Sequence, residues 1–214
     1  MSEFVALRLK RNRGWPWPED SWGLEPMFGA DGWCRSCGVP QKPQSGSLVL
    51  QRKGMVPEGA WIPNWRFDVI CVAQSLTADI EGRFDIDLLP VAWHGKSSPG
   101  EASQIVVTST AEAWFDPDEL RAAAEERHGV AGAACSDCGV WRWMPLVFGM
   151  LPTLRISPSW VDADIVASPE WFGDGMQSFR QILLRRELAE VLAAASPKDV
   201  KVRELDPALV RAPT

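Results

Sequence analysis

The sequence has no tyrosine and only two histidines, His94 and His128, among its 214 residues. Signatures that place histidine, glycine or serine at fixed spacing are also missing: the H-x-E of zinc deaminases, H-E-x-x-H, the P-loop and G-x-S-x-G. Neither histidine stands in a recognised catalytic spacing. The sequence therefore provides no catalytic set, and we predict a protein that is not an enzyme.

Long apolar runs are absent as well. No stretch approaches the ~18–20 residues that a membrane-spanning helix needs, and the first ten residues lack the charged-then-apolar pattern of a signal peptide. With 46% apolar and 23% charged residues, the composition is that of an ordinary globular protein. We expect a cytoplasmic protein with no membrane partner.

Basic residues are fewer than acidic ones, 22 against 28, so the net charge is −6. A negative chain is not attracted as a whole to a phosphate backbone. The segment Arg8–Trp17 is the local exception, with Arg8, Lys10, Arg11 and Arg13 beside Trp15 and Trp17. Basic residues next to aromatic ones can grip single-stranded nucleic acid. We prefer to interpret the segment as a solvated strand end with a proline-rich turn, because nothing later in the chain reinforces the basic patch.

Hydrophobic periodicity predicts an α+β fold with a mixed or antiparallel sheet and two or three helices, in one domain spanning residues 1–214. Arg11 to about Gly46 is rich in Pro and Gly, and we expect it to be irregular. Asp116, Pro117 and Glu119 form a helix-start signal, and Gly129 is the expected end. The predicted strands are Phe4–Lys10, Ser47–Gln51, Arg66–Gln74, Arg83–Trp93, Gln104–Thr110, Ser178–Leu184 and Val200–Leu205, and the helices are Asp116–His128 and Arg185–Ala195.

Twelve tryptophans offset the missing tyrosine. Tryptophan combines a large apolar area with one N–H donor, so it serves cores and interfaces alike. We expect most of these residues in the core. The four in the Gly/Pro-rich opening, Trp15, Trp17, Trp22 and Trp33, are the candidates for surface anchors.

Two cysteine pairs are the chemical centre of the sequence: Cys34 and Cys37 before Gly38, and Cys135 and Cys138 before Gly139. In a Cys-x-x-Cys-Gly knuckle the sulfurs converge, and glycine permits the tight backbone return. Two knuckles supply four thiolates, the ligand set of tetrahedral zinc. We predict one structural Zn(2+) ion that joins the knuckles at 34–38 and 135–139.

Other chemistries fit the same cysteines. Iron held by four thiolates has the same spacing. A redox pair usually lies at a strand-to-helix turn, which neither pair does in the predicted structure. Disulfides are not expected in a chain without an export signal. The fifth cysteine, Cys71, lies in an apolar strand and is interpreted as a small buried hydrophobic residue.

Besides a protein-binding protein and, as the alternative, a zinc-ribbon-like nucleic-acid-binding factor that uses Arg8–Trp17, a metal-dependent hydrolase is a third and weaker interpretation. His94 ends a predicted strand and enters a Gly/Ser loop, where catalytic residues do occur. Acidic pairs accompany it in the sequence: Asp85 with Asp87, Asp116 with Asp118, and Asp162 with Asp164. Asp85 and Asp87 would share a strand face and could hold a divalent cation, although such a face is more often simply exposed to solvent. Asp116 is better explained as a helix cap, and no enzyme class follows from these residues.

The two cysteine motifs, set about a hundred residues apart, resemble those of the bacterial double-CxxCG motif proteins. The ending is similar too: Asp164-Ile165-Val166, a strand to Leu184, the helix Arg185–Ala195 and the strand Val200–Leu205. Members of this family have been linked to immunity functions that neutralise partner toxins. The resemblance implies a non-enzymatic protein that binds a protein partner, and the negative charge would suit a basic toxin.

Overall fold

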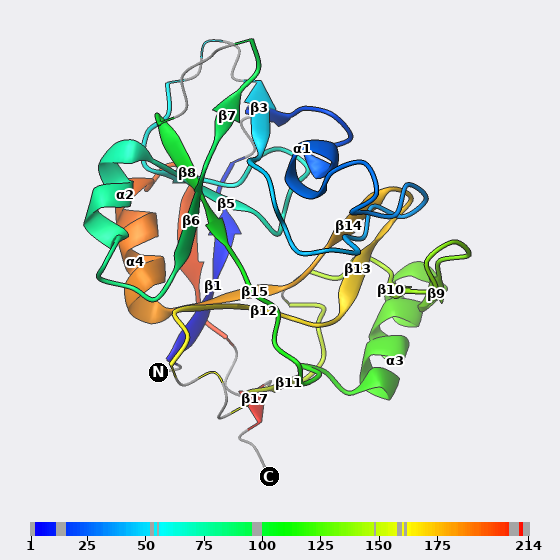
Figure 1. Ribbon diagram of the computed structural model, residues 1–214. Coiled ribbons are helices and arrows are strands. Elements are labelled where there is room, and N and C mark those ends of the chain that lie inside the picture. Colours follow the sequence, from blue (N-terminus) through cyan, green and yellow to red (C-terminus); the bar gives the residue numbers. More distant parts are fainter. Residues whose placement is uncertain are drawn as a thin grey trace.

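The computed structural model describes residues 3–11, 16–51, 54, 56–95, 100–147, 149–157, 160, 162–205 and 210–211. Within these ranges the chain forms four helices and five sheets, so the prediction of an α+β protein is confirmed (Figure 1). The helices outnumber the two or three that the sequence predicted. In the described ranges, no helix combines the length and the apolar character required to cross a bilayer.

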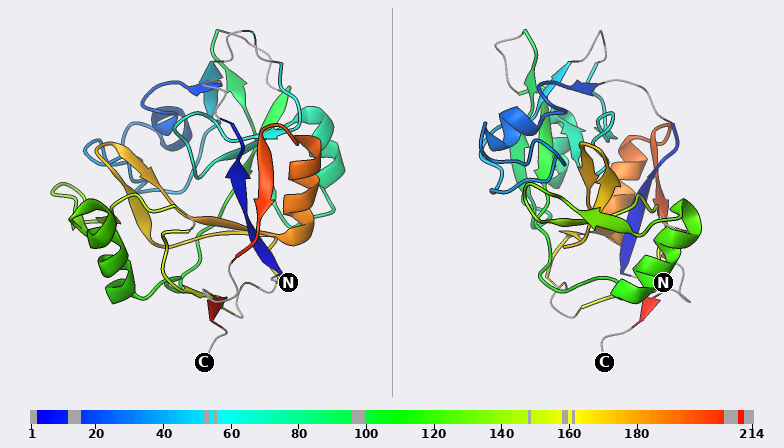
Figure 2. Two further views of the ribbon diagram at one scale, coloured as in Figure 1. Left: turned by 180° about the vertical axis from the view of Figure 1, so that it is seen from behind. Right: turned by 90° about the vertical axis from the view of Figure 1, so that its right-hand side faces the viewer.

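The two ends of the chain meet in one antiparallel sheet. The N-terminal strand β1 (Phe4–Leu9) lies between β15 (Ile182–Arg185) and β16 (Val200–Arg203), and β12 (Ile165–Ala167) extends the sheet beyond β15. Helix α4 (Arg186–Ala195) packs beside β1 and β16, as the view from behind shows (Figure 2). The N-terminal strand is therefore held by segments from the last fifth of the sequence.

A second antiparallel sheet has the order β4-β5-β8-β6. Its strands are β4 (Ala60–Trp61), β5 (Ile70–Ala73), β8 (Ala102–Val106) and β6 (Asp87–Pro90), and α2 (Gln74–Ile80) follows β5 directly. One apolar core joins the two antiparallel sheets to α2 and α4. Its fully buried members include Val5, Val72, Ile80, Ile105, Leu184, Leu188 and Leu192.

A third sheet, with the order β14-β13-β10-β9, carries the second cysteine pair. Its strands are β14 (Gln177–Phe179), β13 (Trp171–Asp174), β10 (Trp141–Trp143) and β9 (Gly132–Ala134), and α3 (Pro117–His128) lies beside it (Figure 1). The core below it is aromatic. The rings of Trp114 and Trp160, both fully buried, lie 4.8 Å apart, and Phe115 meets Phe172 edge to face.

The remaining elements are short. Strands β2 (Trp17–Pro18), β3 (Val49–Gln51) and β7 (Ala92–Trp93) form a three-stranded sheet, and β11 (Leu154–Arg155) pairs in parallel with β17 (Val210–Arg211). Helix α1 (Leu24–Phe28) precedes the first cysteine pair. Met27 of α1 is buried against Leu48, Leu50 and Trp93, which fixes the start of the cysteine-bearing segment on the body of the protein.

The start and end of α3 are as the sequence predicted. A side-chain oxygen of Asp116 accepts hydrogen bonds from the backbone N–H groups of Asp118 (3.0 Å) and Glu119 (3.3 Å). Gly129 ends the helix in the left-handed conformation, with φ of 77°. These two features satisfy backbone groups that the helix leaves open at its ends.

Two helices were not predicted. Helix α1 lies inside the segment expected to be irregular, and it contains Pro26 at its third position. Proline is tolerated there because the first N–H groups of a helix have no partner within it. Helix α2 follows β5 without a break, and its first residue, Gln74, was assigned to the strand. Both helices are shorter than two full turns, so they leave little periodic signal.

Four strand predictions were wrong in extent. Of the predicted strand Arg66–Gln74 only Ile70–Ala73 is β5, and the predicted strand Gln104–Thr110 is β8 at Ala102–Val106. The other two are Arg83–Trp93 and Ser178–Leu184. Phe84 lies in the turn that closes α2, where its N–H donates to the carbonyl of Ile80 (3.2 Å), and β6 starts only at Asp87. The run Ser178–Leu184 belongs to two sheets, because the chain leaves β14 after Phe179 and enters β15 at Ile182. Within β15, Leu183 belongs to the same core as Phe179, whereas Ile182 and Leu184 belong to the core shared with α2 and α4, so the strand is buried on both faces.

Candidate metal centre

The first cysteine pair forms a tight turn closed by a bridge between Trp33 and Pro40. The N–H of Cys34 donates to the carbonyl of Val39 (2.9 Å), and the N–H of Gly38 donates back to the carbonyl of Cys34 (2.7 Å). Gly38 has φ of 73°, and a Cβ atom there would lie 2.1 Å from the carbonyl oxygen of Met176. Glycine is therefore required at position 38 both by the backbone conformation and by the close approach of the backbone at Met176.

The second pair repeats this arrangement between β9 and β10. The N–H of Cys135 donates to the carbonyl of Val140 (3.0 Å), and the N–H of Gly139 donates to the carbonyl of Cys135 (2.9 Å). Gly139 has φ of 72°, within a degree of the value at Gly38. The two turns thus share one backbone geometry, although only the second is flanked by regular strands.

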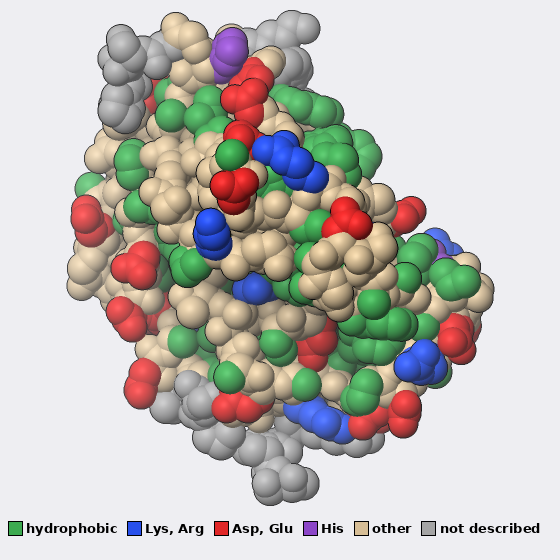
Figure 3. Space-filling view, turned by 45° about the vertical axis from the view of Figure 1, so that its right-hand side comes forward, with side chains coloured by type: hydrophobic (Ala, Val, Ile, Leu, Met, Phe, Trp, Pro, Cys, Tyr) green, Lys and Arg blue, Asp and Glu red, His purple; other side chains and the backbone are tan. Residues whose placement is uncertain are grey.

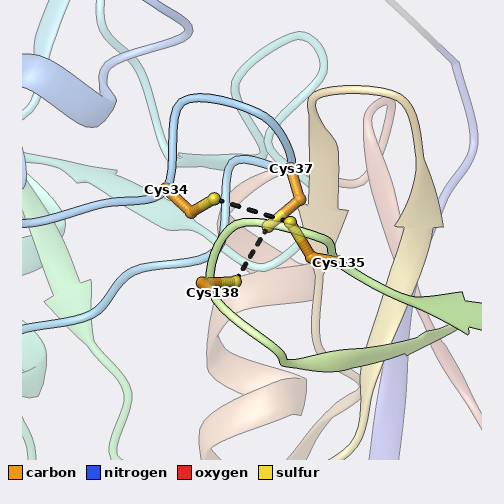
Figure 4. Close-up of side chains that lie close together, drawn as sticks. All are labelled: Cys34, Cys37, Cys135 and Cys138. Atoms are coloured by element: carbon orange, nitrogen blue, oxygen red, sulfur yellow. Dashed lines mark hydrogen bonds between the residues drawn. The ribbon is translucent and has the colours of Figure 1, made fainter.

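The four sulfur atoms converge on one point (Figure 4). The Sγ atoms of Cys34 and Cys135 are 3.7 Å apart, and those of Cys37 and Cys138 are 3.6 Å apart. All four Sγ atoms lie within 4.8 Å of one another, so the group could hold a metal ion. The predicted ligands Cys34, Cys37, Cys135 and Cys138 are therefore brought together from segments far apart in the sequence. Sulfur separations of this size are also too long for disulfide bonds.

A hydrogen-bond network holds the first turn against the third sheet. The Ser178 hydroxyl donates to the Cys37 carbonyl (2.6 Å). Arg142 Nη1 donates to the same carbonyl (3.2 Å), to the carbonyl of Gly175 (2.7 Å) and to the Ser178 hydroxyl (3.2 Å). Sequence reasoning missed Arg142 and Ser178, because neither lies near the first cysteine pair in the chain.

A further contact joins the tips of the two turns. Ser36 of the first donates a hydrogen bond from its hydroxyl to the carboxylate of Asp137 in the second. This hydrogen bond and a second one from the Ser136 hydroxyl lower the pKa of Asp137 below its ordinary value. Ser36 and Asp137, which each lie between the two cysteines of a pair, therefore bring the two turns into direct contact.

Burial and hydrogen bonding tune the cysteines differently. Cys37 is fully buried with Val39 and Trp171, and this burial raises the pKa of its thiol. Burial also raises the pKa of Cys138. Backbone N–H groups of Cys138 and Asp137 act in the opposite direction at Cys135 and lower its pKa to about 7. The cluster thus contains one thiol that ionises easily at neutral pH, and a cation at its centre would stabilise the thiolates of the others.

The fifth cysteine does not belong to the cluster. Cys71 lies in β5 and is fully buried among apolar side chains, as predicted. Burial raises the pKa of its thiol well above the ordinary value. Cys71 is an inert part of the core.

The expected surface tryptophans are only partly at the surface. Trp22 is 38% exposed, but Trp33 is buried, with Nε1 3.3 Å from a carboxylate oxygen of Glu25. Trp33 was therefore predicted wrongly, since its position beside Cys34 draws it into the folded turn. Trp15 lies outside the described residues, and Trp17 is half-buried in β2. Trp65 and Trp141, 47% and 39% exposed, were not predicted as surface residues.

The residues considered for hydrolysis lie apart from the cysteine cluster. His94 follows β7 with Nδ1 3.6 Å from Glu19, and His128 ends α3 with Nε2 2.9 Å from the carbonyl oxygen of Pro145. Asp85 precedes β6, so it does not share a strand face with Asp87, and Asp164 is paired with Arg185 at 3.0 Å. Among the described residues, the four cysteines are the only group of three or more His, Cys, Asp or Glu residues close enough together to hold one metal ion.

The basic N-terminal segment is partly engaged with its own chain. Lys10 Nζ donates to the carbonyl of Pro197, and Arg11 Nε lies 2.5 Å from the carboxylate of Asp199. Arg13 and Trp15 lie outside the described residues. On the face shown in Figure 3, acidic and basic side chains are interspersed among those drawn in colour. The described part of the segment therefore offers fewer free cations than its sequence indicates.

No protein-family model matches this chain, and a comparison with curated proteins finds no match.

Proposed function

We propose that the four cysteines bind one structural Zn(2+) ion and that the protein is a non-enzymatic, protein-binding protein. The observation that carries the first half is the convergence of four sulfur atoms from two turns of the same geometry. With Zn–S bonds of about 2.3 Å, tetrahedral coordination separates sulfur atoms by about 3.8 Å. The distances of 3.6 and 3.7 Å fit this requirement closely.

A site with four thiolate ligands has no open position for water or substrate, so its role is structural. The ion would join the segment after α1 to the hairpin β9–β10, whose cysteines are 101 positions further along the chain. Zinc suits such a structural cross-link because it has no redox chemistry. Iron bound by the same four cysteines would give a coloured, redox-active protein.

The metal content of the purified protein distinguishes a zinc site from an iron site. We expect one zinc per chain, lost when either Cys34 and Cys37 or Cys135 and Cys138 are changed to Ser. Cys71→Ala is the matched control and should keep the metal, because Cys71 lies outside the cluster. Zinc that survives the loss of one pair, or visible absorption from iron, would overturn the single structural zinc site.

The protein-binding half is supported by an exposed apolar groove of about 490 Å³. Phe67 and Val147 line it and are 43% and 58% exposed. Trp65, which is 47% exposed, lies next to it, since its carbonyl accepts a hydrogen bond from Gln177 of the groove wall (3.4 Å). Exposed aromatic residues around a concave apolar surface are typical of interaction sites.

The charged residues around the groove indicate which kind of partner segment would bind there. The charged residues that line it are all arginines: Arg8, Arg180 and Arg203. The partner segment would therefore place apolar side chains in the groove and carboxylates at its edge. The net charge of −6 acts at longer range and favours approach of a partner that is basic elsewhere. A cognate bacterial toxin, as the resemblance implies, is the partner that we propose.

Affinity capture with matched variants tests this role. A partner should be captured by the wild-type protein and lost with the double variant Phe67→Ser and Val147→Ser. Val130→Ser is the control, because Val130 is 53% exposed but does not line the groove. Expression of the captured protein should inhibit growth, and co-expression of the wild-type chain should relieve the inhibition. Capture that is equal for all three proteins, or a partner without toxicity, would contradict the proposal.

A further inference from the structure

A second hollow, of about 460 Å³, opens between the segment that follows the first cysteine turn and the end of β8. Pro40–Gln44 forms one wall, and residues 105–109 form the opposite wall. The volume falls in the range of about 300–1,000 Å³ that is usual for small-molecule sites. Arg180 lines both this hollow and the apolar groove, but only this hollow also contains the buried Arg66 and its partner Asp68.

Two arginines and one carboxylate lie in the hollow. Arg66 is 5% exposed, and its Nη2 lies 3.2 Å from the Asp68 carboxylate. The guanidinium carbon of Arg180 lies 4.2 Å from the ring centre of Trp171. Arg180 also interacts electrostatically with the Asp68 carboxylate. One carboxylate therefore faces two guanidinium groups.

The guanidinium groups have spare hydrogen-bonding capacity. Within the described part of the chain, the Nε atoms of Arg66 and Arg180 are buried and have no hydrogen-bond partner. Burial lowers the pKa of Arg180, and the nearby charge of Asp68 acts in the opposite direction. A buried donor without a partner is destabilising, because it has lost its hydrogen bond to water and gained none in the protein. An oxyanion supplied by a ligand would satisfy these donors.

The rim adds a further positive charge and neutral polar groups. The charged residues that line the hollow are Lys42, Arg66, Arg180 and Asp68, three cations against one anion, in a chain whose net charge is −6. Gln44 and Gln104 close one side through reciprocal amide hydrogen bonds of 3.0 and 3.1 Å. The positive charge is therefore concentrated where the protein surface is hollowed.

We infer that this hollow is a binding site for a small organic anion, whose phosphate or carboxylate group is held by Arg66 and Arg180 and approached by Lys42. The planar, forked guanidinium matches such oxyanions with two parallel hydrogen bonds. The remaining space accommodates the body of the ligand beside the ring of Trp171. This inference does not depend on the proposed protein partner.

The site is also connected to the cysteine cluster. Trp171 packs against Cys34 and Cys37 on one side and carries the Arg180 guanidinium on another. Pro40–Gln44 continues directly from the first cysteine turn. The same turn that presents two metal ligands therefore positions one wall of the anion site.

Titration calorimetry on the purified full-length chain in phosphate-free buffer tests the inference, with pyrophosphate and citrate as probes for the two oxyanion types. At least one probe should bind saturably. Lys42→Gln should weaken binding severalfold, and Arg180→Lys by roughly tenfold or more, because bidentate donors are lost. Lys201→Gln, at an exposed position on β16, should leave the affinity unchanged.

Asp68→Asn distinguishes a ligand site from an ion network that only stabilises the fold. Removing the competing carboxylate should tighten binding of the probe and increase the rise in unfolding temperature that the probe causes. Absence of saturable binding to the wild-type chain would overturn the inference. It would also be overturned if Lys42→Gln and Lys201→Gln weakened binding equally, or if Asp68→Asn bound the probe no better than wild type.

Discussion

The hydroxyl of Ser178 donates a 2.6 Å hydrogen bond to the carbonyl oxygen of Cys37, 141 positions earlier in the chain. Both groups are buried. The bond fixes the backbone of the first cysteine turn on the third sheet, independently of any ion held by the sulfur atoms. The arrangement of the four cysteines is therefore supported by hydrogen bonds of the surrounding protein.

Ser178→Ala should destabilise the protein by about 1–2 kcal/mol, because a buried hydrogen bond is lost. The Cys37 carbonyl keeps its bond from Arg142, which limits the loss. Urea unfolding with the metal bound measures this change. Ser45→Ala, at an exposed position, should leave the free energy of unfolding unchanged within about 0.5 kcal/mol. Equal stability of Ser178→Ala and wild type would show that the bond contributes nothing.

Gly38 and Gly139 provide a matched comparison between the two turns. Both have φ near 72°, so an alanine is strained at either position by about 1 kcal/mol. Only at Gly38 would the new Cβ meet another chain segment, 2.1 Å from the Met176 carbonyl oxygen, whereas nothing lies within 4 Å at Gly139. Gly38→Ala should therefore destabilise the protein clearly more than Gly139→Ala in thermal unfolding. The reverse order would mean that the turn docks differently on β14.

Glu170 should make the protein more sensitive to high pH. Its carboxylate accepts hydrogen bonds from the N–H groups of Trp114 (2.8 Å) and Phe115 (3.4 Å), but burial raises its pKa above the ordinary value of 4.5. A raised pKa favours the protonated form in the folded state. The associated stability is complete below the ordinary pKa and is lost as the pH rises through the raised value.

Glu170→Gln keeps an acceptor without the charge, so its stability relative to wild type should increase as the pH rises from about 4 to 8. Urea unfolding at several pH values measures the difference. Glu125→Gln, at an exposed position on α3, should show no such trend. A pH-independent difference for Glu170→Gln would contradict the raised pKa.

The basic N-terminal segment should not bind single-stranded nucleic acid strongly. Lys10 and Arg11 are already bound to Pro197 and Asp199. We expect weak binding of oligonucleotides at low salt in fluorescence anisotropy. A nucleic-acid-binding protein would instead lose affinity steeply between about 50 and 200 mM salt. Such a loss, reduced by Arg8→Gln, would establish the alternative function.

Sequence patterns with local causes were predicted well. The cap at Asp116, the end of α3 at Gly129 and the helix after residue 185 depend on neighbouring residues, and the structure agrees. The four cysteines of the candidate metal site were also recognised from spacing alone, because a Cys-x-x-Cys-Gly turn forms from its own backbone hydrogen bonds. Short elements such as α1 and α2 were missed, because they are fixed by packing rather than by periodicity.

The α+β character, the four cysteines of the candidate metal site and the glycines that follow them can be read from the sequence, because each depends on residue type and local spacing. Three relationships depend on the folded chain: the two cysteine pairs converge, Ser178 and Arg142 hold the first turn, and Arg66 and Arg180 share one hollow. These relationships join residues far apart in the chain. They arise because the sheets bury their apolar faces against common cores, and that burial fixes which distant side chains become neighbours.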